Sequence, residues 1–115
     1  MAHYAFIQPF PIIPLKIRFG CIMLSEIPIK IEKVSAEKLD MEILRAAIIA
    51  ELDAINLYEQ LAESTKNQEL KKVLLEVARE EKTHVGEFQA LLLKIDKEQV
   101  EELKKGEKEV EELTG

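Results

Sequence analysis

The sequence predicts an all-α protein, in which two long helices form an antiparallel hairpin and a shorter helix follows at the C-terminal end. Two observations carry this prediction. No proline occurs after Ser35, and apolar residues there recur at spacings of three and four, the period of an amphipathic helix. Residues 1–34 are instead proline-rich and partly alternate apolar with polar side chains. We therefore expect an extended or disordered extension over residues 1–34 and a helical domain over residues 35–115.

Each predicted helix has a residue that can cap its N-terminus. A Ser, Asn or Asp side chain at this position accepts a hydrogen bond from the free backbone N–H groups of the first turn. The segment between the first two helices, STKNQ, is short, so these helices should run antiparallel. The predicted caps are Ser35, Asn67 and Asp96, in front of helices over residues 36–63, 68–95 and 97–114. The apolar stripe of the third helix, with Val100, Leu103 and Val110, should pack on the hairpin or on a neighbouring subunit.

Composition excludes several classes of protein. The net charge of −6 argues against nucleic acid as a partner, because phosphate binding needs a basic surface. The single cysteine, Cys21, permits no internal disulfide, and a reducing compartment is the default expectation. The apolar N-terminal stretch is broken by three prolines and carries Lys16 and Arg18, so we expect neither a membrane span nor a signal peptide there.

Metal-ligand types interrupt the apolar stripe of each long helix near its middle. Glu51 stands between Ile48 and Ile55, and Glu81 and His84 occupy the centre of the second stripe. Residues three apart on a helix lie on the same face, one turn apart. Because mid-helix faces mid-helix in an antiparallel hairpin, we expect these three side chains to meet.

Two carboxylates and an imidazole placed together in an apolar stripe need a positive charge to compensate the carboxylates. An unpaired carboxylate in an apolar core is costly, and two of them also repel each other. The nearby basic residues Arg45, Arg79 and Lys82 lie off the stripes, so a metal ion is the natural compensation. Two carboxylates and one imidazole suit iron or manganese, and zinc also accepts such ligands.

The number of ligands predicts a second chain. Di-metal carboxylate sites in four-helix bundles take a Glu from each of two helices and a Glu-x-x-His from each of two others. This chain supplies half of that set, and a two-fold dimer would complete both the site and the bundle. We therefore predict a di-iron centre between two copies, with Glu51, Glu81 and His84 of each copy as ligands.

Simpler interpretations stay open for each of these residues. A single Glu-x-x-His occurs by chance on many surface helices, and a Glu in an apolar stripe often keeps its carboxylate in water. Tyr58, two turns after Glu51, either assists the site or is a core residue with a hydrated hydroxyl. Asp53 and Glu87 either attract incoming cations or are solvated surface acids, which is the simpler interpretation. For the whole chain, the alternative without redox activity is a structural helical oligomer.

The runs EILRAAIIAELDAINLYEQLAE and LLEVAREEKTHVGEFQALLL closely resemble the encapsulated ferritins. The nearest likeness is to the ferritin-like domain in front of the shell domain of archaeal encapsulins, and it covers Met41 to the C-terminal end. The resemblance implies a ferroxidase that oxidises Fe(II) with oxygen at a di-iron centre shared by two chains. It further implies homodimers arranged in an open ring, expected to be a decamer, and iron storage inside a cytoplasmic encapsulin shell.

The resemblance also assigns residues. The family's iron ligands match Glu51, Glu81 and His84, and its tyrosine seven residues after the first ligand matches Tyr58. An accessory acid on the iron-access route matches Asp53. Two family positions differ, because a second accessory acid falls on Ala50 and an aromatic residue falls on Leu57. The chain ends at EELTG without the targeting peptide of free-standing members, so the front domain of a fusion is one interpretation and a free-standing chain is the other.

One rival enzyme class uses the same half-bundle. A rubrerythrin-like peroxidase would reduce peroxide at a di-metal carboxylate site. Such proteins usually carry extra ligands and often a Cys-rich rubredoxin module, neither of which this sequence contains.

Overall fold

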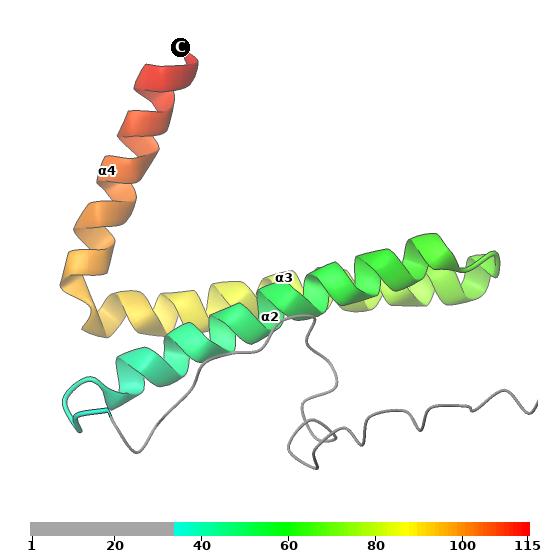
Figure 1. The fold of residues 1–115 in the computed structure, drawn as a ribbon, viewed down its shortest axis with the longest axis horizontal. Helices are drawn as coiled ribbons and strands as arrows, with labels where there is room; N and C mark the ends of the chain where they lie inside the picture. Colours follow the sequence, from blue (N-terminus) through cyan, green and yellow to red (C-terminus); the bar gives the residue numbers. More distant parts are fainter. Residues whose placement is uncertain (1–33) are drawn as a thin grey trace, which may run out of the picture.

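The computed structural model describes residues 34–115, and these form three helices and no strand (Figure 1). The helices are α2, Leu39–Ser64, α3, Gln68–Ile95, and α4, Lys97–Thr114. The predicted all-α architecture of two long helices and a shorter third one is confirmed for this part of the chain. The predicted extension, with His3 and Cys21, lies outside the described residues except for Val34.

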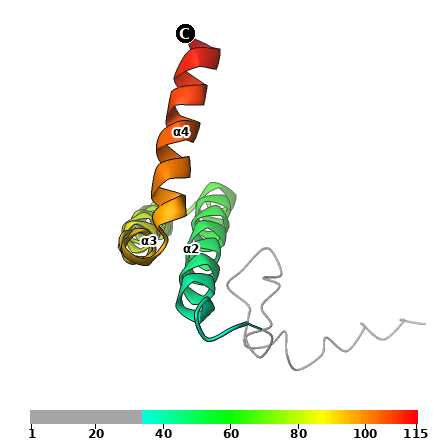
Figure 2. The same ribbon diagram turned by 90° about the vertical axis from the view of Figure 1, so that its left-hand side faces the viewer.

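The hairpin of α2 and α3 is the main body of the molecule, and the two helices lie side by side in both views (Figures 1 and 2). Only three residues, Thr65 to Asn67, separate them. The Asn67 side chain accepts hydrogen bonds from the backbone N–H groups of Glu69 and Leu70, at 3.0 and 3.1 Å. The predicted N-cap of the second helix is therefore confirmed.

The start of α2 differs from the prediction. Lys38, not Ser35, occupies the N-cap position, and its side chain makes no capping hydrogen bond. The Lys38 N–H instead donates to the Ser35 carbonyl at 3.0 Å, so residues 35–38 form a turn and the helix begins at Leu39. Asp40 and Glu42 place negative charge in the first turn, which favours the positive end of the helix dipole.

The interior of the hairpin is small and consists largely of alanine. Alanine permits a close approach of two helices, because interaxial distance depends on the side chains at the contact. Larger apolar residues stay partly exposed, including Leu52 at 50%, Val73 at 60% and Leu91 at 50%. The buried apolar residues of the described chain are Ala46, Ala54, Ile55, Ala62, Ala78 and Leu92. One copy therefore leaves much apolar surface uncovered, as expected for a chain that associates.

A sharp elbow at Asp96 directs α4 away from the hairpin (Figure 1). Asp96 caps α4 by accepting from the Gln99 N–H at 3.0 Å, as predicted. This hydrogen bond, and then the Arg45 side chain, lower the pKa of Asp96. Within the described chain no residue of α4 is buried, and Val110 is 58% exposed. The apolar stripe of α4 therefore packs on the hairpin only near the elbow. Contact of this stripe with a neighbouring subunit stays a prediction.

Among the described helices α2, α3 and α4, none is both long and apolar enough to cross a membrane.

Candidate metal centre

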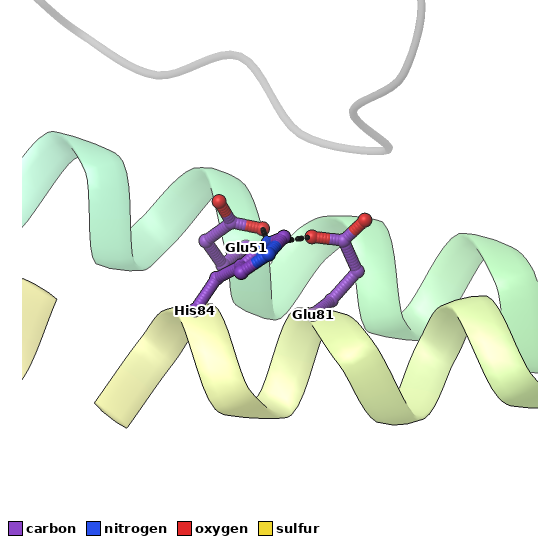
Figure 3. Close-up of side chains that lie close together, drawn as sticks. All are labelled: Glu51, Glu81 and His84. Carbon is purple, nitrogen blue, oxygen red and sulfur yellow. Dashed lines mark hydrogen bonds and ion pairs between the residues drawn. The ribbon is translucent and has the colours of Figure 1, made fainter. Parts of the chain in front are cut away.

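The structure brings Glu51, Glu81 and His84 together at the middle of the hairpin (Figure 3). Glu51 comes from α2, and the other two come from adjacent turns of α3. His84 Nδ1 lies 2.9 Å from Glu81 Oε2 and 3.6 Å from Glu51 Oε2. The three side chains meet as the stripe pattern predicts, because the antiparallel hairpin sets the two helix midpoints against each other.

The three groups hold protons jointly. Burial raises the pKa of Glu51, and its hydrogen bond with Glu81 and the repulsion between the two groups raise it further. The same hydrogen bond lowers the pKa of Glu81, since one carboxyl group retains the proton that the two share. The hydrogen bond with Glu81 also raises the pKa of His84. The metal-free cluster therefore keeps protons on Glu51 and His84 at a pH where isolated side chains would release them.

The cluster has the composition of a metal site. It offers two carboxylate oxygens and one imidazole nitrogen, and these atoms all lie within 4.8 Å of one another. Hard oxygen ligands with a single imidazole suit Fe(II) and Mn(II), and Zn(II) also accepts them. Within residues 34–115, this is the one group of three metal-ligating side chains that could surround an ion.

The basic residues near the cluster form ion pairs elsewhere, and within residues 34–115 no Lys or Arg side chain is paired with the cluster. Arg45 pairs with Asp96, Arg79 with Glu76 on the surface of α3, and Lys82 with Glu59 across the hairpin. The expectation that Arg45, Arg79 and Lys82 lie off the ligand stripes is therefore confirmed. The only cation available inside the cluster is His84 itself, when it is protonated.

The remaining candidate residues lie around this group and are not part of it. Tyr58 is half-buried on α2, two turns beyond Glu51. Glu87 is an exposed acid, and its charge contributes to the raised pKa of His84. Asp53 is only 7% exposed, so the simpler interpretation of Asp53 as a solvated surface acid is wrong. Helix periodicity did not reveal this burial, because Asp53 lies two residues from Glu51 and outside the predicted stripe.

The exposed side of the cluster lies on a face of α3 that also carries exposed apolar side chains. The His84 side chain is 44% exposed, whereas those of Glu51 and Glu81 are 19% and 17% exposed. Val73 and Leu91 lie eleven residues before and seven residues after His84, and these spacings place all three on one face of α3. Both are at least half exposed. The exposed side chains one turn from His84 are the acids Glu80 and Glu87, and the exposed apolar side chains lie farther along the helix. A half-exposed ligand on a face that also carries exposed apolar side chains is compatible with a second surface that completes the site.

Comparison with known proteins identifies the family. Residues 42–114 match the family model described as rubrerythrin. The chain is 69% identical over 75 residues to the ferritin-like–encapsulin shell fusion protein of Pyrococcus furiosus. The matched residues cover 65% of this chain and 22% of that protein. It is 43% identical over 56 residues to an encapsulin nanocompartment cargo protein of Myxococcus xanthus, across 49% of this chain and 43% of that one. The chain thus matches only a minor part of each relative.

A solved structure shows the same fold. The crystal structure of the encapsulated ferritin domain from Pyrococcus furiosus aligns with a TM-score of 0.69 and 61% identity, over 80% of this chain and 96% of that one. The span matched by the family model contains all three residues of the cluster. The chain therefore belongs to the rubrerythrin family, and its predicted likeness to the encapsulated ferritins is confirmed.

Proposed function

We propose that this chain is a ferroxidase, which oxidises Fe(II) to Fe(III) with oxygen at a di-iron site shared by two copies. The observation that carries this proposal is the cluster of Glu51, Glu81 and His84, which combines iron-ligand types with a histidine that is partly exposed. Membership of the rubrerythrin family supports a di-iron oxidoreductase. The likeness to the encapsulated ferritin domain favours iron as the substrate.

The protonation of the cluster indicates how it would receive iron. Ligation requires ionised carboxyl groups and a neutral imidazole, so loading displaces protons. Glu81, whose pKa is lowered, is the carboxylate available first. Glu51 and His84, whose pKa values are raised, would release their protons as the cation approaches. With iron held by Glu51, Glu81 and His84, two Fe(II) would each give one electron to oxygen, which would take up two protons to become hydrogen peroxide, and the carboxylates would offset the charge of the ions. We assign an assisting role to Tyr58 and a place on the iron-access route to the buried Asp53.

A second copy follows from the ligand count. One chain offers three ligand atoms, whereas two copies related by a two-fold axis would offer six, from four Glu and two His side chains. The same association would cover the exposed face that contains Val73 and Leu91. It would also turn two hairpins into a four-helix bundle. Apolar burial and metal binding therefore favour the same dimer.

The proposed setting follows from the relatives. These relatives are an encapsulin shell fusion protein and an encapsulin cargo protein. We propose that this chain likewise works within an encapsulin shell in the cytoplasm, where the shell stores the ferric product. The open ring of dimers, expected to be a decamer, belongs to the same proposal. Residues 35–115 would form the ferritin-like unit, preceded by an extension of residues 1–34.

The deciding experiment compares ligand variants with a matched surface variant. His84→Ala and Glu51→Ala should lose stoichiometric Fe(II) binding and most iron-dependent oxygen consumption, whereas Glu42→Ala, on the exposed side of α2, should retain both. Iron titration, an oxygen electrode and mass in solution with and without iron provide the readouts. If both ligand variants bind and oxidise iron as the parent does, the site assignment is wrong. Iron affinity of the parent should rise with pH through a value above 6.5, the ordinary pKa of histidine.

The family match also supports a second candidate activity, the reduction of peroxide. The family model is described as rubrerythrin, and a rubrerythrin-like peroxidase would use the same ligands. The two activities differ in the preferred oxidant. Single-turnover mixing of the Fe(II)-loaded protein with oxygen or with hydrogen peroxide separates them. Faster oxidation by oxygen supports the ferroxidase, and faster oxidation by peroxide supports the peroxidase.

A further inference from the structure

The elbow between α3 and α4 occurs where the local sequence does not require a break. α3 ends at Ile95, α4 begins at Lys97, and the one residue between them, Asp96, has an extended backbone with φ −106° and ψ 90°. The surrounding sequence, LLKIDKEQV, contains neither glycine nor proline, and each of its residues is tolerated inside helices. The bend therefore depends on the Asp96 side chain, which caps α4 within this segment and contacts Arg45 outside it.

A single residue, Asp96, contacts all three helices at this point. Asp96 Oδ1 accepts a hydrogen bond from the Gln99 N–H at 3.0 Å, which starts α4. Asp96 Oδ2 accepts from the Arg45 guanidinium of α2 at 2.6 Å. The Asp96 backbone N–H donates to the Leu92 carbonyl at 2.8 Å, which ends α3. Asp96 is itself only 9% exposed.

The bend also sacrifices helix hydrogen bonds. In one continuous helix, the N–H groups of residues 97–99 would bond to the carbonyls of residues 93–95. In the bent form, the Gln99 N–H turns to Asp96 instead, and the Leu93 carbonyl has only a long contact of 3.5 Å with Lys97 Nζ. Backbone hydrogen bonding thus favours the straight form, and the Asp96 carboxylate opposes it.

Apolar packing holds α4 only weakly in its bent position. A cavity of about 340 Å³ lies between the hairpin and the start of α4, lined by residues that include Ile48, Leu92 and Leu103. Leu103 is still 44% exposed, and no residue of α4 is buried. Straightening would therefore cost little apolar contact.

We propose that Asp96 is a conformational switch residue, positioned by Arg45. While its carboxylate is held by Arg45 and caps α4, the chain bends. When these contacts are lost, α3 and α4 join into one straight helix over residues 68–114. The switch decides where the apolar stripe of α4 is presented, because bending brings Leu103 to the cavity and straightening carries it away from the hairpin.

Distance measurement across the elbow tests this proposal in the full-length chain. Spin labels on Thr83→Cys and Glu109→Cys, both exposed, are placed in a Cys21→Ser background and diluted with unlabelled protein. A continuous helix would separate these positions by about 39 Å, since 26 residues rise about 1.5 Å each. The bent form gives a shorter distance.

The expected results separate the cap from the ion pair. Asp96→Ala removes both and should shift the distribution to the long distance. Arg45→Gln removes only the ion pair and should add a long-distance population to the short one. Lys104→Gln, which breaks an exposed ion pair within α4, is the control and should leave the distribution unchanged. Circular dichroism at 222 nm verifies that each variant is folded, and straightening should increase its helical signal.

Two results would overturn the proposal. If the folded Asp96→Ala and Arg45→Gln proteins both keep the parent's short distance, neither contact holds the bend. If only Asp96→Ala lengthens it, the role assigned to Arg45 is wrong and the cap alone is responsible.

Discussion

Replacing Glu51 by glutamine should change the stability of this protein in opposite directions with and without metal. The substitution keeps the shape and hydrogen-bonding capacity of the side chain and removes its charge. The pKa of Glu51 is higher in the folded protein than its ordinary value of 4.5. The protonated Glu51 side chain therefore stabilises the fold fully below pH 4.5, and this stabilisation is lost as pH rises through the pKa of Glu51 in the folded protein. At neutral to alkaline pH the metal-free parent therefore carries an electrostatic penalty that the variant lacks.

The size of this penalty follows from the geometry. The ligand atoms of the cluster lie within 4.8 Å of one another. At this upper bound of the separation, two full charges repel by about 0.9 kcal/mol in water and by about 3.5 kcal/mol at an effective dielectric constant of about 20. Because both carboxyl groups are less than a fifth exposed, the value should fall between these limits. We expect Glu51→Gln to stabilise the metal-free protein by about 1–3 kcal/mol at pH 8.

Metal should reverse the order of stability. A ligand present at 100 times its dissociation constant stabilises the folded state by about 2.7 kcal/mol, and the variant lacks a ligand group needed for this gain. The assay is urea unfolding followed by circular dichroism at fixed protein concentration, with EDTA or with Mn(II) as an air-stable substitute for Fe(II). Glu42→Gln, an exposed acid on the same helix, is the control and should follow the parent in both conditions.

Two outcomes would refute this reasoning. Equal stabilisation of Glu51→Gln and the parent by Mn(II) would show that Glu51 is not a ligand. A variant that is less stable than the parent in EDTA would show that hydrogen bonding within the cluster outweighs repulsion.

Three further predictions concern the fold, and each is measured as a free energy of unfolding in urea. Asn67→Ala removes the acceptor for two N–H groups at the start of α3 and should cost about 1 kcal/mol, whereas Asn67→Asp should retain the cap. Ala62→Leu inserts a large side chain at a position with 0% exposure and should cost about 1–3 kcal/mol, whereas Ala90→Leu at an exposed position should change stability by less than about 0.5 kcal/mol. The pKa of Asp96 is lowered, chiefly by the Gln99 N–H, so its stabilising contribution is present above its ordinary pKa of 3.8 and is lost as pH falls through the folded value. Asp96→Asn should therefore flatten the fall of stability in acid, and an unchanged acid profile would contradict this assignment.

Some of the fold could be predicted because local chemistry controls it. The α3 and α4 boundaries match the prediction because Asn67 and Asp96 satisfy free N–H groups from adjacent positions. The predicted start of α2 was wrong, because Ser35 contributes its backbone carbonyl to a turn and does not cap the helix. The sequence could not distinguish these two roles, because both are open to the same serine. Capping patterns identify which residues can cap a helix, whereas the contacts of the folded chain decide which residue does.

The candidate site divides in the same way. Spacing alone places Glu81 and His84 on one face of α3, because helix periodicity is a property of the backbone. Their approach to Glu51 required only a short connection between two helices of similar length, so the sequence was sufficient to predict that all three would meet.

Only the tertiary structure shows how the side chains share protons and which groups are buried. The opposite pKa shifts of Glu51 and Glu81 arise from one hydrogen bond across the hairpin, and the burial of Asp53 depends on packing outside the ligand stripe. The ion pair at the elbow is likewise a tertiary feature, because Arg45 lies 51 residues away in the chain from Asp96, whereas the cap on Gln99 is local. Periodicity and capping act within a few residues, whereas desolvation and ion pairing depend on neighbours that only the folded chain brings together.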